Sequence, residues 1–339
     1  MLYSKLAAHG QESKIMRVEK KLVASNKSTV AIIGLGPVGS ILAAHLSNGG
    51  FNVVVQDAMP HIREKVKQDG IIISGITKLT AKIDKIAESI PRLVEFNPEL
   101  VFVVTKACYL KDVLPEIKQI YSPKLKVVSF QNGLGNEQVI AEHLGIDTAY
   151  RVVINYAGNL VHPGHAMMNW FQPPNYVGAR HKGKYTTDAT TKKIADMLTK
   201  AGLKTAESQN IGEHVWEKGI LNAALCSICA VTGQTMKEAM EYPHSRKLAI
   251  KVLEEGLKTA EADGCNFGKD ALARFTTYLE KGGDHKPSML IDVENKRPTE
   301  VDFMSGAITR YGQKYGIPTP ANSMFTDLLK TIENHYPKR

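Results

Sequence analysis

The chain has 339 residues, enough for two domains with buried cores, and its 43% hydrophobic and 23% charged residues are typical of a soluble globular protein. Its formal net charge of +9 suits a cleft that receives a phosphorylated cofactor and a carboxylate substrate. No basic stretch interleaved with aromatic residues indicates nucleic-acid binding. No apolar stretch reaches the roughly 18 residues that a membrane span needs. We therefore expect a cytoplasmic protein that binds neither nucleic acid nor membrane.

Residues 1–27 are basic and contain no long apolar stretch, so they do not form a secretory signal. We interpret them as an N-terminal extension without an assigned role. The four cysteines of the chain are too few for a disulfide framework at this length. Cys226 and Cys229 form a C-x-x-C inside an apolar helical run, with no second pair at metal spacing. We predict buried thiols in a reducing compartment and no metal.

Strands and helices alternate along residues 28–210, which predicts an α/β domain of the Rossmann type. Near-continuous apolar strands are typical of a parallel sheet that is covered on both faces. Residues 69–87 are expected to form a small hairpin, and the polar residues 181–191 a loop. The predicted strands are Thr29–Ile33, Asn52–Gln56, Leu100–Val104, Lys126–Phe130, Tyr150–Asn155 and Asn175–Gly178, with helices that include Pro37–Asn48 and Lys111–Tyr121.

Strand patterns stop after residue 210. Residues 213–233, 246–264 and 299–316 all carry apolar residues at helical spacing, and Gly316 followed by prolines marks the end of the last helix. We therefore predict an all-α domain over residues 211–339, with the active site in the cleft between the two domains.

The segment "GLGPVG" supplies G-x-G-x-x-G between a strand and a helix. Gly34 permits a tight turn, Gly36 lets the backbone approach a pyrophosphate, and Gly39 lets helix and strand pack closely. The phosphates would then lie at the positive end of the helix. We predict a dinucleotide site that comprises Gly34, Leu35, Gly36, Pro37, Val38 and Gly39.

Asp57 ends the next strand, where a carboxylate accepts hydrogen bonds from ribose hydroxyls and repels a 2′-phosphate. It therefore favours NADH over NADPH. The nearest arginine, Arg63, lies six residues further on. A structural interpretation of Asp57, as the N-cap of the following helix, is compatible with cofactor binding.

Lys218 and Asn222 lie four residues apart on one face of a predicted helix. A partly desolvated ammonium loses its proton more easily, which suits a general acid in carbonyl reduction. Residue types alone favour a different interpretation of Lys218, a surface lysine whose apolar stem packs on the protein while its ammonium reaches water. Further on, Thr299 and Glu300 are interpreted as capping the helix that follows them.

Six segments together resemble the ketopantoate reductase family, from about Val30 to Asn322. They are "GLGPVG", "TKA" at 105–107, "QNG" at 131–133, "WEKGILN", "KPSMLIDVENKRPTEVDF" and "YGIPTP". The resemblance implies a Rossmann domain, a helical domain and an active site between them. It also implies reduction of a 2-oxo acid to the (R)- or D-2-hydroxy acid, with conversion of 2-dehydropantoate (ketopantoate) to pantoate as the leading substrate expectation.

The resemblance also assigns roles in catalysis and substrate binding. Lys218 matches the lysine that donates a proton to the carbonyl oxygen, and Glu300 matches the acid that pairs with the lysine region or with a substrate hydroxyl. Asn222 matches the asparagine that orients the substrate. Ser288 and Asn132 match positions that hold the substrate carboxylate and the nicotinamide end, so Asn132 counts for both substrate and cofactor.

A sixth position, Lys106, matches a lysine near the cofactor. Two departures from the family pattern bear on specificity. Cys226 stands where many members place a second asparagine against the distal end of the substrate. Asp57 and Ala58 stand where members that favour NADPH place a basic residue. The NAD-dependent D-2-hydroxyacid (D-mandelate-type) dehydrogenases, a branch of the family, are similar in having Asp there.

Three functions stay open at this point. The first is an NAD(P)H-dependent 2-oxoacid reductase, for which Asp57 favours NADH and the family favours NADPH. The second is the NAD-dependent D-2-hydroxyacid dehydrogenase, and the third is a dinucleotide-binding regulator without catalysis. The expected partner is a small-molecule 2-oxoacid. A homodimer is one expectation for the oligomeric state.

Overall fold

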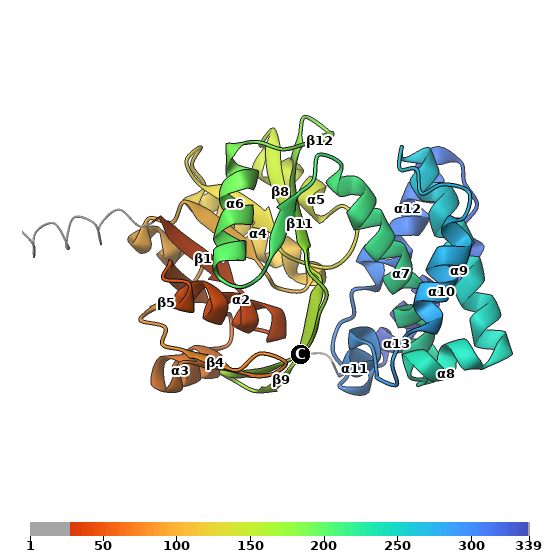
Figure 1. Cartoon of the computed structure of the whole chain (residues 1–339), viewed down its shortest axis with the longest axis horizontal. Coiled ribbons are helices and arrows are strands. Elements are labelled where there is room, and N and C mark those ends of the chain that lie inside the picture. The colour runs from red at the N-terminus through yellow and green to blue at the C-terminus, as the bar shows by residue number, and fades with distance from the viewer. Residues whose placement is uncertain (1–27, 338–339) are drawn as a thin grey trace, which may run out of the picture.

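The computed structural model describes residues 28–337 and has an α/β domain followed by a helical domain (Figure 1). The predicted fold class is confirmed. The proposed extension at residues 1–27 lies outside the described residues. The last strand, β13 (Thr205–Glu207), is followed by α7 (Ile211–Thr232), and every later element among the described residues is helical.

A nine-stranded sheet forms the centre of the α/β domain, in the order β12-β11-β8-β7-β6-β1-β2-β5 with β13 beside β11. The strands from β8 to β5 are parallel, whereas β11 is antiparallel to β8 and β12 and parallel to β13. Their bounds are β1 (Thr29–Ile33), β2 (Asn52–Gln56), β5 (Lys85–Ala87), β6 (Leu100–Val103), β7 (Lys126–Ser129), β8 (Thr148–Val153), β11 (Asn175–His181) and β12 (Lys184–Thr186).

Helices cover both faces of this sheet, as the apolar strands predicted. Val30 and Ile32 of β1 lie in one apolar cluster, whereas Ala31 and Ile33 lie in another on the opposite face. The helices of this domain are α2 (Pro37–Asn48), η1 (Pro91–Phe96), α3 (Pro60–Asp69), η2 (Ala107–Tyr109), α4 (Leu110–Ile120), α5 (Asn136–Leu144) and α6 (Ala189–Lys200).

A second sheet, in the order β4-β3-β10-β9, packs against α2. The predicted hairpin is confirmed for β3 (Ile71–Gly75) and β4 (Leu79–Ala81), although β5 joins the main sheet instead. The strands β9 (Tyr156–His162) and β10 (His165–Phe171) were not predicted. Most side chains of β9 are exposed, so its sequence lacks the apolar alternation of a half-buried strand. The prediction of a loop over residues 181–191 is wrong in part, because β12 lies within this segment and pairs with β11.

The helical domain is built around α7, which contacts every later α-helix and also the strands β8, β11 and β12. Figure 1 shows α7 on the side of this domain that faces the sheet. The later elements are α8 (Met236–Glu241), α9 (Pro243–Ala262), α10 (Ala271–Glu280), α11 (Ser288–Glu294), η3 (Val301–Phe303), α12 (Ser305–Tyr315) and α13 (Pro320–Asn334).

The sequence led us to expect no apolar stretch long enough to span a membrane, and α7 corrects this expectation. Among the described residues, α7 is one helix that is long and apolar enough to cross a membrane, with a mean hydropathy of 1.2. However, 67% of that window is buried inside the protein, which is typical of a core helix. The thiols of Cys226 and Cys229 are buried in it, as predicted.

Candidate active site

The predicted site residues of the α/β domain gather at the carboxyl edge of the parallel strands. Gly34 follows β1, Asp57 follows β2, Lys106 follows β6 and Asn132 follows β7. Because parallel strands end at the same edge of a sheet, these residues share one side of the domain, where ligands bind in open α/β sheets.

The glycine turn has the geometry that a dinucleotide requires. Gly34 has a φ of +101°, and a Cβ there would lie 2.9 Å from the backbone nitrogen of Thr105. A Cβ on Gly39 would lie 1.9 Å from the carbonyl oxygen of Gly34, so only glycine lets helix and turn approach this closely. A Cβ on Gly36 would meet no atom within 4 Å. The surrounding protein therefore leaves no space for a side chain at Gly34 and Gly39, whereas the space beside Gly36 is open.

Helix α2 begins at Pro37, and its N-cap residue Gly36 forms no side-chain capping bond. The first N–H groups of α2 are consequently available to an anion, and the open backbone at Gly36 leaves space for one. The residues present fit the pyrophosphate of a dinucleotide.

Asp57 ties the end of β2 to the glycine turn. Its carboxylate accepts the N–H of Leu35 at 2.7 Å and the N–H of Met59 at 2.9 Å. The N-cap of α3 is Met59, so the capping role considered for Asp57 is wrong. Arg63 donates to the backbone oxygen of Asp57 at 2.5 Å, which brings a cation to the backbone of this residue.

Lys218 joins the two domains. It lies on α7, and its ammonium donates to the carbonyl oxygen of Ile154, directly after β8. The side chain thus reaches the same sheet edge as the glycine turn. The pKa of Lys218 is lowered to about 8, first by burial and then by the positive charge of Arg151.

Asn222 and Cys226 follow Lys218 at successive turns of α7, so the three side chains lie in one row. Asn222 is half-buried, whereas Cys226 is buried. Burial strongly raises the pKa of the Cys226 thiol, which leaves it protonated and weakly polar.

Glu300 is the N-cap residue of η3, but its side chain forms no capping bond there. The residue is 9% exposed, and its carboxylate instead accepts the backbone N–H of Ala107 at 2.9 Å, across the domain contact. The capping role expected for the Glu300 side chain is therefore wrong. The N–H and hydroxyl of Thr299 both donate to Glu333, while Val301 donates weakly to the Thr299 hydroxyl at 3.3 Å. Burial raises the pKa of Glu300 despite its bond to Ala107.

Lys106 makes a second contact across the domains. Its ammonium lies 2.5 Å from the carboxylate of Asp292 on α11 and donates to the carbonyl oxygen of Pro298 at 3.2 Å. Ser288, the first residue of α11, is exposed. Burial raises the pKa of Asp292, and the positive charges of Lys106 and Arg297 offset part of this increase. The cofactor role of Lys106 and the substrate role of Ser288 stay predictions.

Asn132 is half-buried in the turn after β7. Its backbone oxygen accepts the side-chain amide of Asn136 at 2.7 Å, and the neighbouring Gln131 donates to the carbonyl oxygen of Thr105 at 2.7 Å. Leu134 donates to the carbonyl oxygen of Phe303, a further bond between the domains. The turn after β7 is therefore hydrogen-bonded to both domains.

Sequence reasoning missed Arg151, a buried arginine on β8. It donates to the hydroxyl of Ser129 at 3.0 Å and to the carbonyl oxygen of Gly133 at 2.8 Å, and it lies 3.6 Å from Glu137. A charged residue within the apolar strand 148–153 was the available signal, because a buried charge requires partners.

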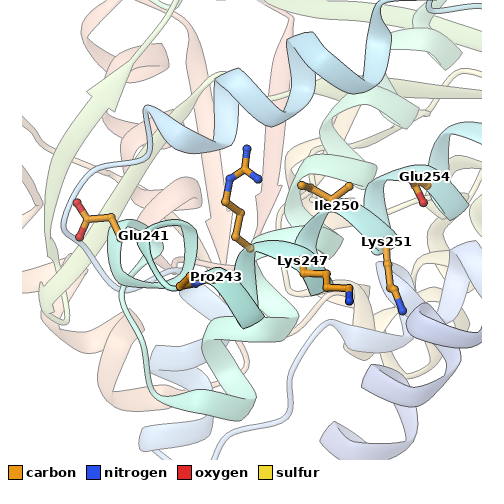
Figure 2. A pocket seen from close by; sticks show the side chains of 7 residues that line it. Glu241, Pro243, Lys247, Ile250, Lys251 and Glu254 are labelled. Carbon is orange, nitrogen blue, oxygen red and sulfur yellow. The ribbon is translucent and has the colours of Figure 1, made fainter.

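A surface hollow away from these residues follows one side of α9 (Figure 2). Arg246 in it pairs with Glu280 of α10 at 2.6 Å. None of the predicted site residues lines this hollow.

The fold and the site define a class of protein. A Rossmann domain with a glycine turn and a carboxylate at the end of the second strand, in contact with a helical domain that presents a lysine, an amide and a carboxylate, is the arrangement of a nicotinamide-dependent oxidoreductase. Comparison with known proteins agrees. The family model "Ketopantoate reductase PanE/ApbA" matches residues 30–181, and its C-terminal counterpart matches residues 210–333. The chain belongs to the ketopantoate reductase family.

Individual relatives cover nearly the whole chain. A 2-dehydropantoate 2-reductase of Streptococcus pyogenes serotype M18 (strain MGAS8232) is 27% identical over 313 residues, which cover 90% of this chain and 97% of the relative. The structure of D-mandelate dehydrogenase with NADH is 25% identical, with a TM-score of 0.77, and covers 91% of this chain and 100% of its own. A PanE/ApbA family ketopantoate reductase from Ralstonia eutropha JMP134 has a TM-score of 0.79 at 22% identity, covering 90% and 98%.

These findings confirm the resemblance and the enzyme class, an oxidoreductase that acts on CH–OH groups with a nicotinamide dinucleotide. The expected homodimer and the cytoplasmic location stay predictions.

Proposed function

We propose that the chain reduces a 2-oxo acid to the (R)- or D-2-hydroxy acid, with Lys218 as the proton donor. The observation that carries the proposal is the contact of Lys218 with the carbonyl oxygen of Ile154, which brings an ammonium of the helical domain to the sheet edge that holds the glycine turn. The bound dinucleotide supplies the hydride for C2 of the substrate.

Lys218 has the properties of a general acid at neutral pH. With a pKa of about 8, its ammonium is mostly protonated at pH 7 yet gives up the proton more easily than an exposed lysine. We assign the developing alkoxide oxygen to this ammonium. Glu300, whose carboxylate partly counteracts the lowered pKa of Lys218, is assigned to holding the proton on the lysine.

The remaining predicted residues would orient the substrate. Asn222 stands one turn from Lys218 and offers an amide to the substrate oxygens. Asn132, which follows β7, and Ser288, the first residue of α11, are assigned to the substrate carboxylate and the nicotinamide end. Fixing the substrate in this way lowers the entropic part of the barrier.

The relatives named 2-dehydropantoate 2-reductase support 2-dehydropantoate as the substrate. A second candidate, an NAD-dependent D-2-hydroxyacid dehydrogenase for a bulkier apolar side chain, is favoured by Cys226. The buried thiol ends the row on α7 and gives the distal end of a substrate an apolar contact. The likeness to the D-mandelate dehydrogenase structure supports the same candidate.

For the cofactor, we propose NADH. Asp57 is placed within reach of the glycine turn, and its negative charge opposes a 2′-phosphate. Arg63 contacts the backbone of Asp57 and is the cation that would temper this preference.

A survey of initial rates tests these assignments together. Three substrates, 2-dehydropantoate, 2-oxoisovalerate and benzoylformate, are each assayed with NADH and with NADPH. We expect the highest kcat/KM for 2-dehydropantoate with NADH, and a preference for benzoylformate would instead support the D-2-hydroxyacid dehydrogenase. Absence of hydride transfer on all three, despite binding of NADH, would contradict both and leave the non-catalytic regulator.

A further inference from the structure

Arg151 is a buried arginine of β8, three residues before Ile154, whose carbonyl oxygen accepts the ammonium of the proposed proton donor Lys218. Arg151 is 3% exposed, and its Nε atom has no hydrogen-bond partner. A buried cation is costly unless paired, so its position calls for an explanation.

The pairing of Arg151 is incomplete. Its acidic neighbour, Glu137 of α5, lies 3.6 Å away and accepts the hydroxyl of Tyr185 at 3.0 Å. The Oε2 atom of Glu137 is buried without a hydrogen-bond partner. Because Glu137 lies 3.6 Å away and also binds Tyr185, it neutralises Arg151 only in part. The remaining positive charge acts on neighbouring groups in this low-dielectric region.

Arg151 also fixes the surface against which α7 packs. Its Nη2 atom donates to the carbonyl oxygen of Gly133, and the next residue, Leu134, packs on α7 at Gly219. A Cβ on Gly219 would lie 2.6 Å from the Leu134 side chain, so this contact is tight. Gly219 directly follows Lys218. The chain of contacts therefore runs from Arg151 to the backbone of the proposed proton donor.

Other titratable groups also face Lys218 and Arg151. Besides burial, the pKa of Lys218 is lowered by Arg151 of β8 and raised by Cys226 of α7 and by Glu300 before η3. The pKa of Arg151 is lowered by burial and raised by Glu137 of α5, Tyr185 of β12 and Glu300. Among these groups Arg151 is the one cation beside Lys218.

We propose that Arg151 is a positioning residue for Lys218, holding the turn 131–135 against α7 and placing a fixed positive charge on β8, the strand after which Ile154 accepts the ammonium. The proposal rests on the proposed function of Lys218 as general acid. Burial makes the larger contribution to the ease with which the ammonium loses its proton, and the charge of Arg151 adds to it.

The test is the pH dependence of kcat/KM for 2-oxoacid reduction, measured from pH 6 to pH 10. A general acid must be protonated in the free enzyme, so activity falls at high pH with a midpoint near the pKa of Lys218, about 8. In Arg151→Gln the midpoint moves upward by roughly 0.5–1 pH unit, because a like charge has been removed. The matched control Arg151→Lys keeps the charge and the wild-type midpoint.

A lower rate in Arg151→Gln with an unchanged midpoint would overturn the proposal, since a purely structural residue changes rate or stability without moving that midpoint. Glu137→Gln provides an independent test of opposite sign. Removing the carboxylate leaves Arg151 less neutralised, so the midpoint moves to lower pH. A midpoint that stays or rises in Glu137→Gln would also overturn it, even if Arg151→Gln fails to fold.

The failure of the proposed function is a separate result. If Lys218→Arg retains both the activity and the midpoint of the wild type, the midpoint does not belong to Lys218. That result contradicts the role of Lys218 whatever the Arg151 variants show.

Discussion

Glu300 of the helical domain accepts the backbone N–H of Ala107, at the start of η2 in the α/β domain, at 2.9 Å. Glu300, to which the family resemblance assigns a catalytic role, therefore also forms a hydrogen bond between the two domains. A buried N–H without a partner costs about 1–3 kcal/mol, so Glu300 contributes to the domain contact as well as to the charge around Lys218.

Two substitutions separate these contributions. Glu300→Ala removes the acceptor and should lower the free energy of unfolding by about 1–3 kcal/mol, whereas Glu300→Gln keeps an acceptor and should cost less than about 1 kcal/mol. Both remove the negative charge and should reduce kcat. Denaturant unfolding and steady-state rates provide the two readouts. Equal stability of the two variants would show that the bond to Ala107 contributes nothing.

The glycine turn yields a matched pair of substitutions. Gly39→Ala places a Cβ 1.9 Å from the Gly34 carbonyl oxygen and should destabilise the protein by about 1–3 kcal/mol or prevent folding. Gly36→Ala meets no atom of the protein within 4 Å and should keep wild-type stability. It should still raise the Kd for NADH at least about tenfold, because the methyl group occupies the approach of the pyrophosphate. Thermal unfolding and NADH fluorescence titration measure the pair, and normal NADH affinity in Gly36→Ala would refute this assignment.

Asp57 should set the choice of cofactor. In Asp57→Ala the repulsion of a 2′-phosphate disappears, and Arg63 remains nearby as a cation. We expect the ratio of kcat/KM with NADPH to that with NADH to rise about tenfold or more. Asp57→Asn, which keeps an acceptor for the Leu35 N–H, controls for loss of that bond. An unchanged ratio in both variants would show that Asp57 serves only the turn.

His45 on α2 gives the protein a pH-dependent stability. One ring nitrogen contacts the carbonyl oxygen of Ala201 at 2.8 Å, while Nε2 is buried without a partner, and burial lowers the pKa of His45 below 6.5. The unfolded chain takes up a proton below pH 6.5 that the folded chain resists. Stability should therefore be retained above pH 6.5 and fall as the pH drops below it. Unfolding measured from pH 7.5 to pH 5 should show a shallower decline in His45→Gln, and an identical decline would exclude His45 as a cause.

Much of the fold could be predicted because its signals are local. Thr29–Ile33, Pro37–Asn48 and Asn52–Gln56 match β1, α2 and β2 at both ends, since a β-branched run and punctuating glycines specify each element within a few residues. The strand β10 was missed because it pairs with β3, far away in the chain, and β9 was missed because it pairs with β10 without an apolar alternation of its own.

The candidate site divides in the same way. The row of Lys218, Asn222 and Cys226 follows from helical spacing alone, and the glycine turn from its motif. The pairing of Lys106 with Asp292 could not be predicted, since it joins two domains through residues nearly two hundred positions apart. Arg151 depends in the same way on Glu137 and Ser129, which reach it only in the folded sheet.

Turnover and cofactor affinity in Lys218→Met together test Lys218 as the proton donor. Methionine keeps much of the length of the lysine side chain but has no proton to donate. We expect kcat for 2-oxoacid reduction to fall by about 10²–10⁴-fold while the Kd for NADH stays within about twofold of the wild type. Wild-type turnover in Lys218→Met would show that Lys218 is not the proton donor.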